Sequence, residues 1–115
     1  MQQRDVQRLL HIVDYCHEIH KTIMRYTDDF SVFESDPDYQ RSVSFCLMQI
    51  GELSGGLSDE FKQETRQMIP WPAIRAMRNM VAHDYGNIDQ QKIWQTAHSD
   101  IDVLEKFCIQ QLSSS

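Results

Sequence analysis

Apolar residues recur every three or four positions through four long stretches of this 115-residue chain, and this spacing constrains the fold more than any other feature. Steps of three and four place side chains on one face of an α-helix. The stretch over residues 6–24 carries one such row and, on a neighbouring face, a second row that repeats every seven residues. The two rows are Val6, Leu9, Val13, Cys16, His20 and Ile23, and Ile12, Ile19 and Tyr26. A helix with two apolar faces is expected to be central in a bundle or shared with a partner chain.

Helix start and stop signals divide the first half of the chain. Residues 27–29 are expected to end the first helix, and residues 30–34 are expected to form a short connection. Asp36-Pro37 is typical of an N-cap followed by proline in the first turn, where a missing N–H costs nothing. A second helix is therefore predicted from there to about Ser54, ending at the Gly-Gly pair that follows. Its core stripe is predicted to be Val43, Leu47, Ile50 and Ser54.

The second half of the chain is divided in the same way. Ser58 is predicted to cap a short helix that extends to about Gln67, and residues 70–72, Pro-Trp-Pro, are expected to be extended. A third long helix should follow, with a stripe interrupted at Gly86, and Asp89 is predicted to cap the last and most regular helix. The two stripes are Ile74, Met77 and Val81, and Ile93, Ala97, Ile101, Leu104, Cys108 and Leu112.

These elements indicate the fold class. Only 4 Gly and 3 Pro occur in the chain, which is too few for a turn-rich β-sandwich or barrel. The sequence therefore predicts an all-α protein, an antiparallel four-helix-type bundle with one additional short helix. One domain is expected over residues 1–112, followed by a frayed polar tail at residues 113–115.

Charge narrows the possible partners. The formal net charge of −6 argues against a protein that coats nucleic acid without sequence preference, because phosphate neutralisation supplies most of that affinity. The charge is unevenly distributed, however. Residues 61–83 contain four cations and one acid, a local balance of +3. Two such stretches brought together by a dimer would concentrate positive potential at one narrow site.

The sequence shows no signal for a membrane span, a disulfide or reactive thiol, or a cofactor-binding loop. No apolar run approaches the ~20 residues that span a bilayer, and the first ten residues lack the apolar core of a signal peptide, so a cytoplasmic location without a membrane partner is expected. The three cysteines are widely spaced among apolar residues, which predicts buried reduced thiols. The Gly-Gly pair lacks the rest of a phosphate-binding loop, and no cofactor is predicted.

Two histidines of the first helix, His17 and His20, form an i, i+3 pair that could chelate a metal. No further Cys, His or carboxylate stands at a spacing in the sequence that would complete a site. No metal ligand is therefore predicted.

The segment over residues 71–89, WPAIRAMRNMVAHDYGNID, carries the most informative polar group. Asn79 and His83 are four residues apart and share one helical face, while Arg78 reaches the same cleft from the flank. Tyr85 follows at the helix end. One interpretation is structural: Arg78 and Asn79 bond loop carbonyls, and His83 caps the helix C-terminus, where a cation is favoured.

The other interpretation is phosphodiester cleavage without a metal. A histidine with a pKa near 6.5 can take a proton from a ribose 2′-hydroxyl or return one to the leaving oxygen. An arginine can clamp the phosphate and stabilise the charge of the transition state. Asn79 could orient His83 or the phosphate. The residue chemistry leaves both interpretations open.

The string of Arg78, four residues, His83, one residue and Tyr85 resembles the HepT-like branch of the HEPN superfamily. Trp71, Ile74, Ile88-Asp89, Trp94 and the earlier Ile50-Gly51-Glu52 extend the resemblance over most of the chain. Gly86 and Asn87 depart from it, because the family pattern has an aromatic residue and then glycine there.

The resemblance implies a dimeric all-α toxin, a metal-independent endoribonuclease of a type VII-like toxin–antitoxin system. Its catalytic pair maps to Arg78 and His83, with Asn79 in support. It also implies a minimal nucleotidyltransferase as cognate antitoxin, which can neutralise the toxin by transferring AMP to Tyr85. The alternative hypothesis is a non-catalytic subunit that binds nucleotide or substrate for a two-component nucleotidyltransferase, and a plain structural dimer module is a third.

Overall fold

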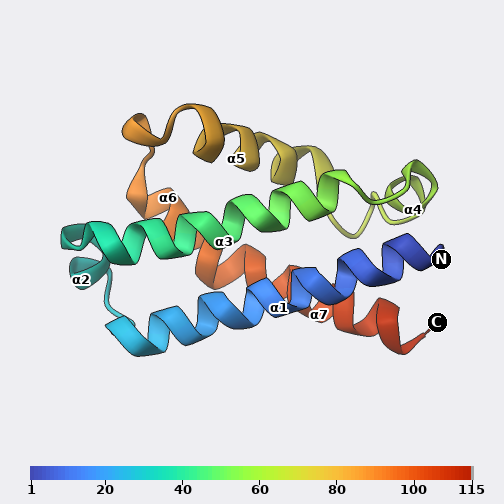
Figure 1. The fold of residues 1–115 in the computed structure, drawn as a ribbon, viewed down its shortest axis with the longest axis horizontal. Coiled ribbons are helices and arrows are strands. Elements are labelled where there is room, and N and C mark those ends of the chain that lie inside the picture. Colours follow the sequence, from blue (N-terminus) through green and yellow to red (C-terminus); the bar gives the residue numbers. More distant parts are fainter. Residues whose placement is uncertain (115) are drawn as a thin grey trace.

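The computed structural model describes residues 1–114, and every regular element in that part of the chain is a helix. Four long helical segments run in alternating directions, so that both chain ends lie at the same end of the bundle (Figure 1). They are α1 (Gln3–Tyr26), α3 (Pro37–Gly55), α5 (Trp71–His83), and α6 (Gln90–Gln95) continued by α7 (Ile101–Ser113). The predicted all-α antiparallel bundle is confirmed.

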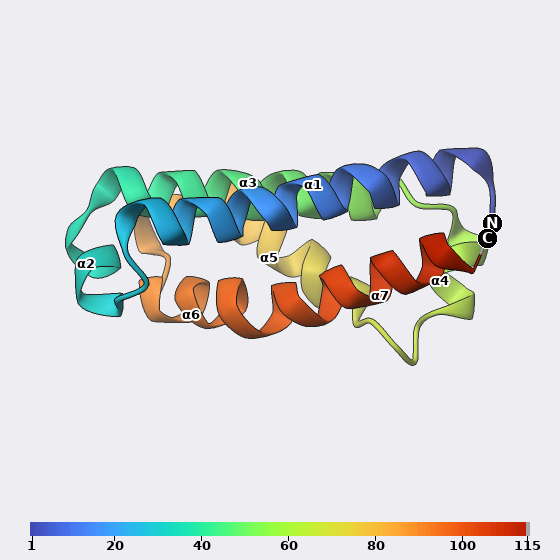
Figure 2. The same ribbon diagram turned by 90° about the horizontal axis from the view of Figure 1, so that it is seen from below.

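The first helix is central within a single chain, because α1 packs against both α3 and α7. In the perpendicular view of Figure 2, α6 and α7 run along the bundle below α1 and α3. The buried stripe of α1 combines the two predicted rows, and Val6 and Val13 lie half-buried at its flank. The apolar part of that stripe is Leu9, Ile12, Cys16, Ile19 and Ile23.

The predicted caps of the middle helices are confirmed. The Asp36 side chain accepts hydrogen bonds from the backbone N–H groups of Asp38 and Tyr39, at 3.0 and 3.2 Å, and α3 ends at Gly55. All four predicted core positions of α3 are buried. The Ser58 hydroxyl accepts from the Phe61 N–H at 3.2 Å and begins α4 (Asp59–Glu64), which ends three residues before the predicted boundary.

The N-terminus of α4 is tied to α1 by a buried carboxylate. Asp5 accepts hydrogen bonds from the backbone N–H and the hydroxyl of Ser58, both at 2.7 Å. Burial acts to raise the pKa of Asp5, but the hydrogen bonds from Ser58 stabilise the charged form more, so its pKa lies below the ordinary value. This contact fixes the segment that leads into α5.

Two predictions of non-helical structure, at residues 30–34 and at residues 70–72, were wrong. Residues 30–34 form most of a short helix, α2 (Phe30–Ser35), because Asp29 caps it by accepting from the Ser31 N–H at 2.8 Å, and Phe33 is buried against the Trp94 ring. The bundle thus has two short helices, α2 and α4, where one was predicted. Trp71, expected to be extended, is the first residue of α5, and its indole N–H donates to the Thr65 hydroxyl at 3.0 Å.

The last helix was also expected to be the most regular, and this was wrong. A π-helical turn, η2 (Thr96–Asp100), separates α6 from α7. The core positions Ile93, Ala97 and Ile101 are spaced by two steps of four, which overshoot a 3.6-residue turn, and the wider π turn keeps all three on the buried side. Asp89 caps α6 as predicted, accepting from the Gln91 N–H at 3.0 Å.

At the chain end, Ser113 is the last residue of α7, and the tail expected at residues 113–115 includes Ser115, which lies outside the described residues. None of the helices within residues 1–114 is long and apolar enough to cross a membrane.

Candidate functional site

Arg78 of α5 packs directly against Gly51 of α3. A Cβ atom added to Gly51 would overlap the Arg78 Cβ and Cγ, so only glycine at that position lets the two helices come this close. The Arg78 guanidinium pairs with the carboxylate of Glu52, the residue after Gly51, and its Nη1 donates to the Asn79 Oδ1 at 3.1 Å. The sequence Gly51-Glu52 on α3 therefore positions the arginine of α5.

A groove of about 1150 Å³ opens beside Arg78, between the end of α3, the short α4 and the start of α5. Five cationic side chains line it against two acidic ones, Glu52 and Asp59. The cations are Arg8, Lys62, Arg66, Arg75 and Arg78. The basic stretch seen in the sequence thus lines one surface, and α1 adds Arg8, which sequence reasoning missed because it lies more than fifty residues earlier.

His83 stands apart from this groove. It is the last residue of α5 and is exposed, and no hydrogen bond or ion pair joins its ring to another residue of the described chain. It comes five positions after Arg78 in the α-helix, which corresponds to roughly 140° around the axis and about 7.5 Å along it. Within one chain the Arg78 guanidinium therefore bonds Asn79 but lies apart from His83, while Asn79 and His83 share the exposed side of α5 as predicted.

Tyr85 begins a 3₁₀ turn, η1 (Tyr85–Asn87), one residue after the end of α5. Its side chain is half-buried and packs against the core cluster. The Asn87 amide donates to the Asp84 carboxylate at 2.7 Å and closes the turn. Gly86 stands where the family pattern has an aromatic residue. Its φ is negative, and a Cβ atom added to it would meet nothing within 4 Å, so neither the backbone nor the surroundings require glycine at this position.

The structural interpretation of the motif is only partly consistent with these contacts. Arg78 donates to the side chains of Glu52 and Asn79, not to loop carbonyls. His83 does occupy the last turn of α5, where a cation is favoured.

Of the predicted apolar stripe of α5, Val81 is buried, whereas Ile74 and Met77 are half-buried. The opposite side of α5 carries exposed residues, among them Asn79 and His83.

The thiols have no part in this site. Cys16, Cys46 and Cys108 are free and buried, as predicted. Burial, reinforced by nearby carboxylates, raises the pKa of Cys46 to about 11 and that of Cys108 to about 12, and it raises the pKa of Cys16 as well. Thiols that stay protonated are poor nucleophiles and poor metal ligands.

Comparison with known proteins is consistent with this geometry. The family model described as "Ribonuclease HepT-like" matches residues 12–110. A protein of Caldanaerobacter subterraneus subsp. tengcongensis is 32% identical over 85% of both chains, and one of Methanocaldococcus jannaschii is 30% identical over 82% of this chain and 76% of its own. Both are named "Putative RNase". None of the solved structures matches the chain. Because the matched residues include all of α3, α5 and the Arg78 contact, the chain belongs to the HepT-like ribonuclease family.

Proposed function

We propose that this protein is an endoribonuclease toxin that acts in the cytoplasm without a metal ion, with Arg78 and His83 as its catalytic residues. The observation that carries the proposal is the position of Arg78. It is held by α3 at the edge of a groove with five cations, in a chain whose net charge is −6. An RNA strand that places one phosphate at Arg78 has further cations within the same groove for its neighbouring phosphates.

The proposed reaction is transfer within the RNA. The ribose 2′-oxygen attacks the adjacent phosphorus, and the bond from phosphorus to the 5′-oxygen breaks. His83 takes the 2′-hydroxyl proton, and the leaving 5′-oxygen receives a proton from a protonated histidine or water. Arg78 stabilises the added negative charge, with Asn79 in support. The products are a 2′,3′-cyclic phosphate and a 5′-hydroxyl.

Dimerisation is part of this proposal. Arg78 and His83 lie on different faces of one α5, so a single chain does not present them to the same phosphate. Two copies that share the exposed side of α5 would bring both motifs to one cleft. The basic grooves of the two chains would then approach the same RNA.

The test is RNA cleavage and growth inhibition by His83→Ala. We expect cleavage to fall at least about 100-fold, because a general acid or base contributes roughly that factor, and toxicity to disappear. His11→Ala, another exposed histidine, on α1, is the matched control and should cleave normally. Equal cleavage by wild type and His83→Ala, or loss of cleavage with a chelator, contradicts the mechanism.

A second candidate is favoured by one observation. Arg78 is already engaged by Glu52 and Asn79, and His83 does not line the groove. This suits a non-catalytic subunit that binds nucleotide or substrate for a nucleotidyltransferase. That role predicts neither cleavage nor growth arrest by the chain alone, so the same experiment separates the two candidates.

The proposed regulator is a cognate minimal nucleotidyltransferase that acts as antitoxin. It would transfer AMP from ATP to the Tyr85 hydroxyl and release pyrophosphate, adding bulk and negative charge two residues after His83. Incubation with that enzyme and ATP should raise the mass of the chain by one or more AMP units. Tyr85→Phe should abolish the gain, and Tyr15→Phe, a half-buried tyrosine on α1, should not. Mass gain that persists in Tyr85→Phe excludes this site.

A further inference from the structure

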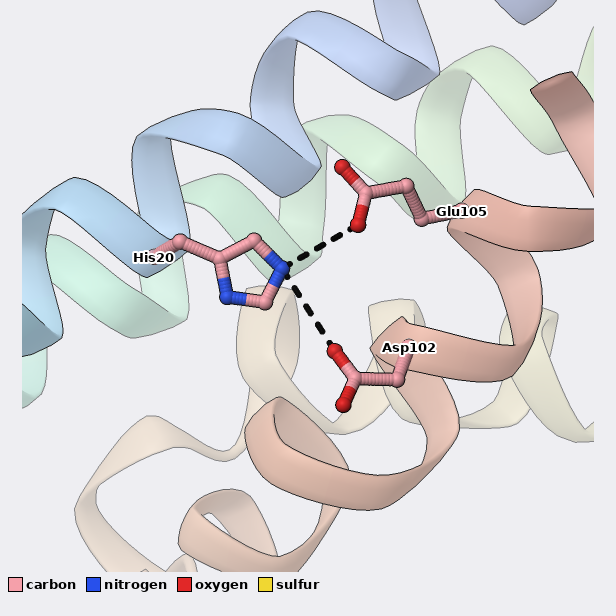
Figure 3. Close-up of side chains that lie close together, drawn as sticks. All are labelled: His20, Asp102 and Glu105. Carbon is pink, nitrogen blue, oxygen red and sulfur yellow. Dashed lines mark hydrogen bonds and ion pairs between the residues drawn. The ribbon is translucent and has the colours of Figure 1, made fainter.

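Two histidines of α1 face two carboxylates of α7 on a part of the molecule that the proposed function does not use. His17 and His20 are one turn apart on α1, and Asp102 and Glu105 are one turn apart on α7. The His20 Nε2 lies 3.2 Å from the Glu105 Oε1 and 3.5 Å from the Asp102 Oδ1. Figure 3 shows the His20 ring directed at both carboxylates. The His17 Nε2 lies 2.9 Å from the other Glu105 oxygen.

We propose that three of these side chains, His20, Asp102 and Glu105, bind a divalent transition-metal cation of the zinc class, while His17 holds the second oxygen of Glu105. Metal-to-ligand distances of about 2.0–2.1 Å in a tetrahedral zinc site separate neighbouring ligand atoms by about 3.3 Å. The His20 Nε2 lies 3.2 Å from the Glu105 Oε1 and 3.5 Å from the Asp102 Oδ1, and both separations are close to that spacing. Atoms of His20, Asp102 and Glu105 all lie within 4.8 Å of one another, so one ion can contact all three without rearrangement of the helices.

The donor set favours this class of metal. One imidazole nitrogen with two carboxylate oxygens suits Zn²⁺ and its neighbours better than Mg²⁺ or Ca²⁺, which prefer oxygen alone. Two carboxylates balance the charge of a divalent ion. A neutral histidine that binds through Nε2 carries its proton on Nδ1, so the His20 imidazole need only adopt that tautomer.

Exposure gives the site an inner and an outer side. The Glu105 side chain is 15% exposed, whereas those of His20 and Asp102 are 40% and 51% exposed. The ion would reach the site from solvent and rest on Glu105. Bound there, it would link the first and last helices of the bundle. Sequence spacing on α1 alone did not reveal this site, because the two carboxylates come from residues more than eighty positions later.

The experiment titrates Zn²⁺ into the chelator-treated full chain and follows calorimetric heat and thermal unfolding. We expect one Zn²⁺ per chain and a rise in Tm of roughly 10 °C when free zinc is 100 times Kd. His20→Asn and Glu105→Gln should each weaken binding at least about 10-fold, because even partners of metal ligands contribute that much. Asp102→Asn changes the most exposed of the three ligands and serves if the other variants unfold.

His11→Asn is the matched control, since His11 is an exposed histidine of the same helix outside the cluster. Normal binding by His11→Asn with weakened binding by the cluster variants supports the site. Absence of heat and of a Tm shift at millimolar zinc overturns it, as does equal binding by wild type and all cluster variants. RNA cleavage is assayed in parallel: a chelator should lower Tm without changing cleavage, so failure of this site is distinct from failure of the proposed ribonuclease.

Discussion

The α3–α5 contact and the α1–α7 contact both place basic side chains of one helix against carboxylates of an antiparallel neighbour, but they are built differently. At α3–α5 a glycine removes the intervening side chain, and the Cβ and Cγ of Arg78 pack directly on Gly51. At α1–α7 full-sized buried side chains, among them Cys16 and Cys108, separate the helices, and the histidines and carboxylates lie at the rim. The first contact fixes the position of the Arg78 side chain by close packing of the two helices. At the second contact the histidines and carboxylates are partly exposed and do not determine the helix spacing, so they can form other hydrogen bonds.

Because Arg78 is held so closely, we expect even a conservative substitution at this position to lower activity. Arg78→Lys keeps the charge but loses the planar fork that pairs with Glu52 and with a phosphate. On the proposed function, we expect RNA cleavage to fall about 10²–10³-fold, or about 3–4 kcal/mol in the activation barrier, with little change in Tm. Steady-state cleavage of a defined RNA measures the effect. Arg41→Lys on α3, outside the groove, is the control, and an equal loss in both variants would contradict a special role for Arg78.

The next largest effect is expected at the glycine. Gly51→Ala places a methyl group against the Arg78 Cβ and Cγ, and overpacking of this kind costs about 1–3 kcal/mol of unfolding free energy. Gly55→Ala is a matched control on the same helix, because a Cβ there meets nothing within 4 Å. Urea unfolding should show destabilisation of the first variant alone. Equal stability of the two would mean that α5 can shift away from α3 without penalty.

The same contrast explains what the sequence could reveal. Periodicity predicted α1, α3 and their buried faces because each stripe is a local property of one helix. The Arg78 motif was also local, and so it was visible as a string of residues. Partners across helices were not visible: Arg8 reaches the groove from α1, and Glu105 reaches His20 from α7. Those positions depend on how helices pack, which one sequence does not specify.

Local sequence patterns did not predict α2 or the π turn η2. Residues 30–34 were too short for a periodicity argument, and Asp29 was not recognised as a cap. The apolar stripe of the last helix, with its steps of four and three, predicts one regular α-helix, but its steps of four also fit the π turn at Thr96–Asp100. Contacts with residues outside the turn accompany η2. The Nδ1 of His98, a residue of η2, lies 2.8 Å from the Trp94 carbonyl oxygen, and its Nε2 lies 2.7 Å from the Asp28 carboxylate.

The smallest effect is expected at the rim of α1–α7 in the absence of metal. His17→Gln removes one partly exposed ion pair with Glu105 but keeps a side chain that can donate a hydrogen bond. Exposed pairs of this kind contribute about 0–1 kcal/mol, so metal-free unfolding should differ from wild type by less than about 1 kcal/mol. Urea unfolding with a chelator present measures it, and His11→Gln reports the effect of the substitution itself.

A loss above 2 kcal/mol in metal-free His17→Gln, by this measure, would mean that the α1–α7 cluster is a structural brace like Gly51 and Arg78. Cys16, Ile19 and Ile23 of α1 are buried whether or not His17 has a partner, and they lie on the side of the helix that packs in the core. Removing the His17 imidazole leaves those contacts intact, while the Glu105 carboxylate keeps His20 at 3.2 Å. The apolar side chains alone should therefore hold the two helices together, which is the condition for a rim that can exchange hydrogen bonds for a metal ion.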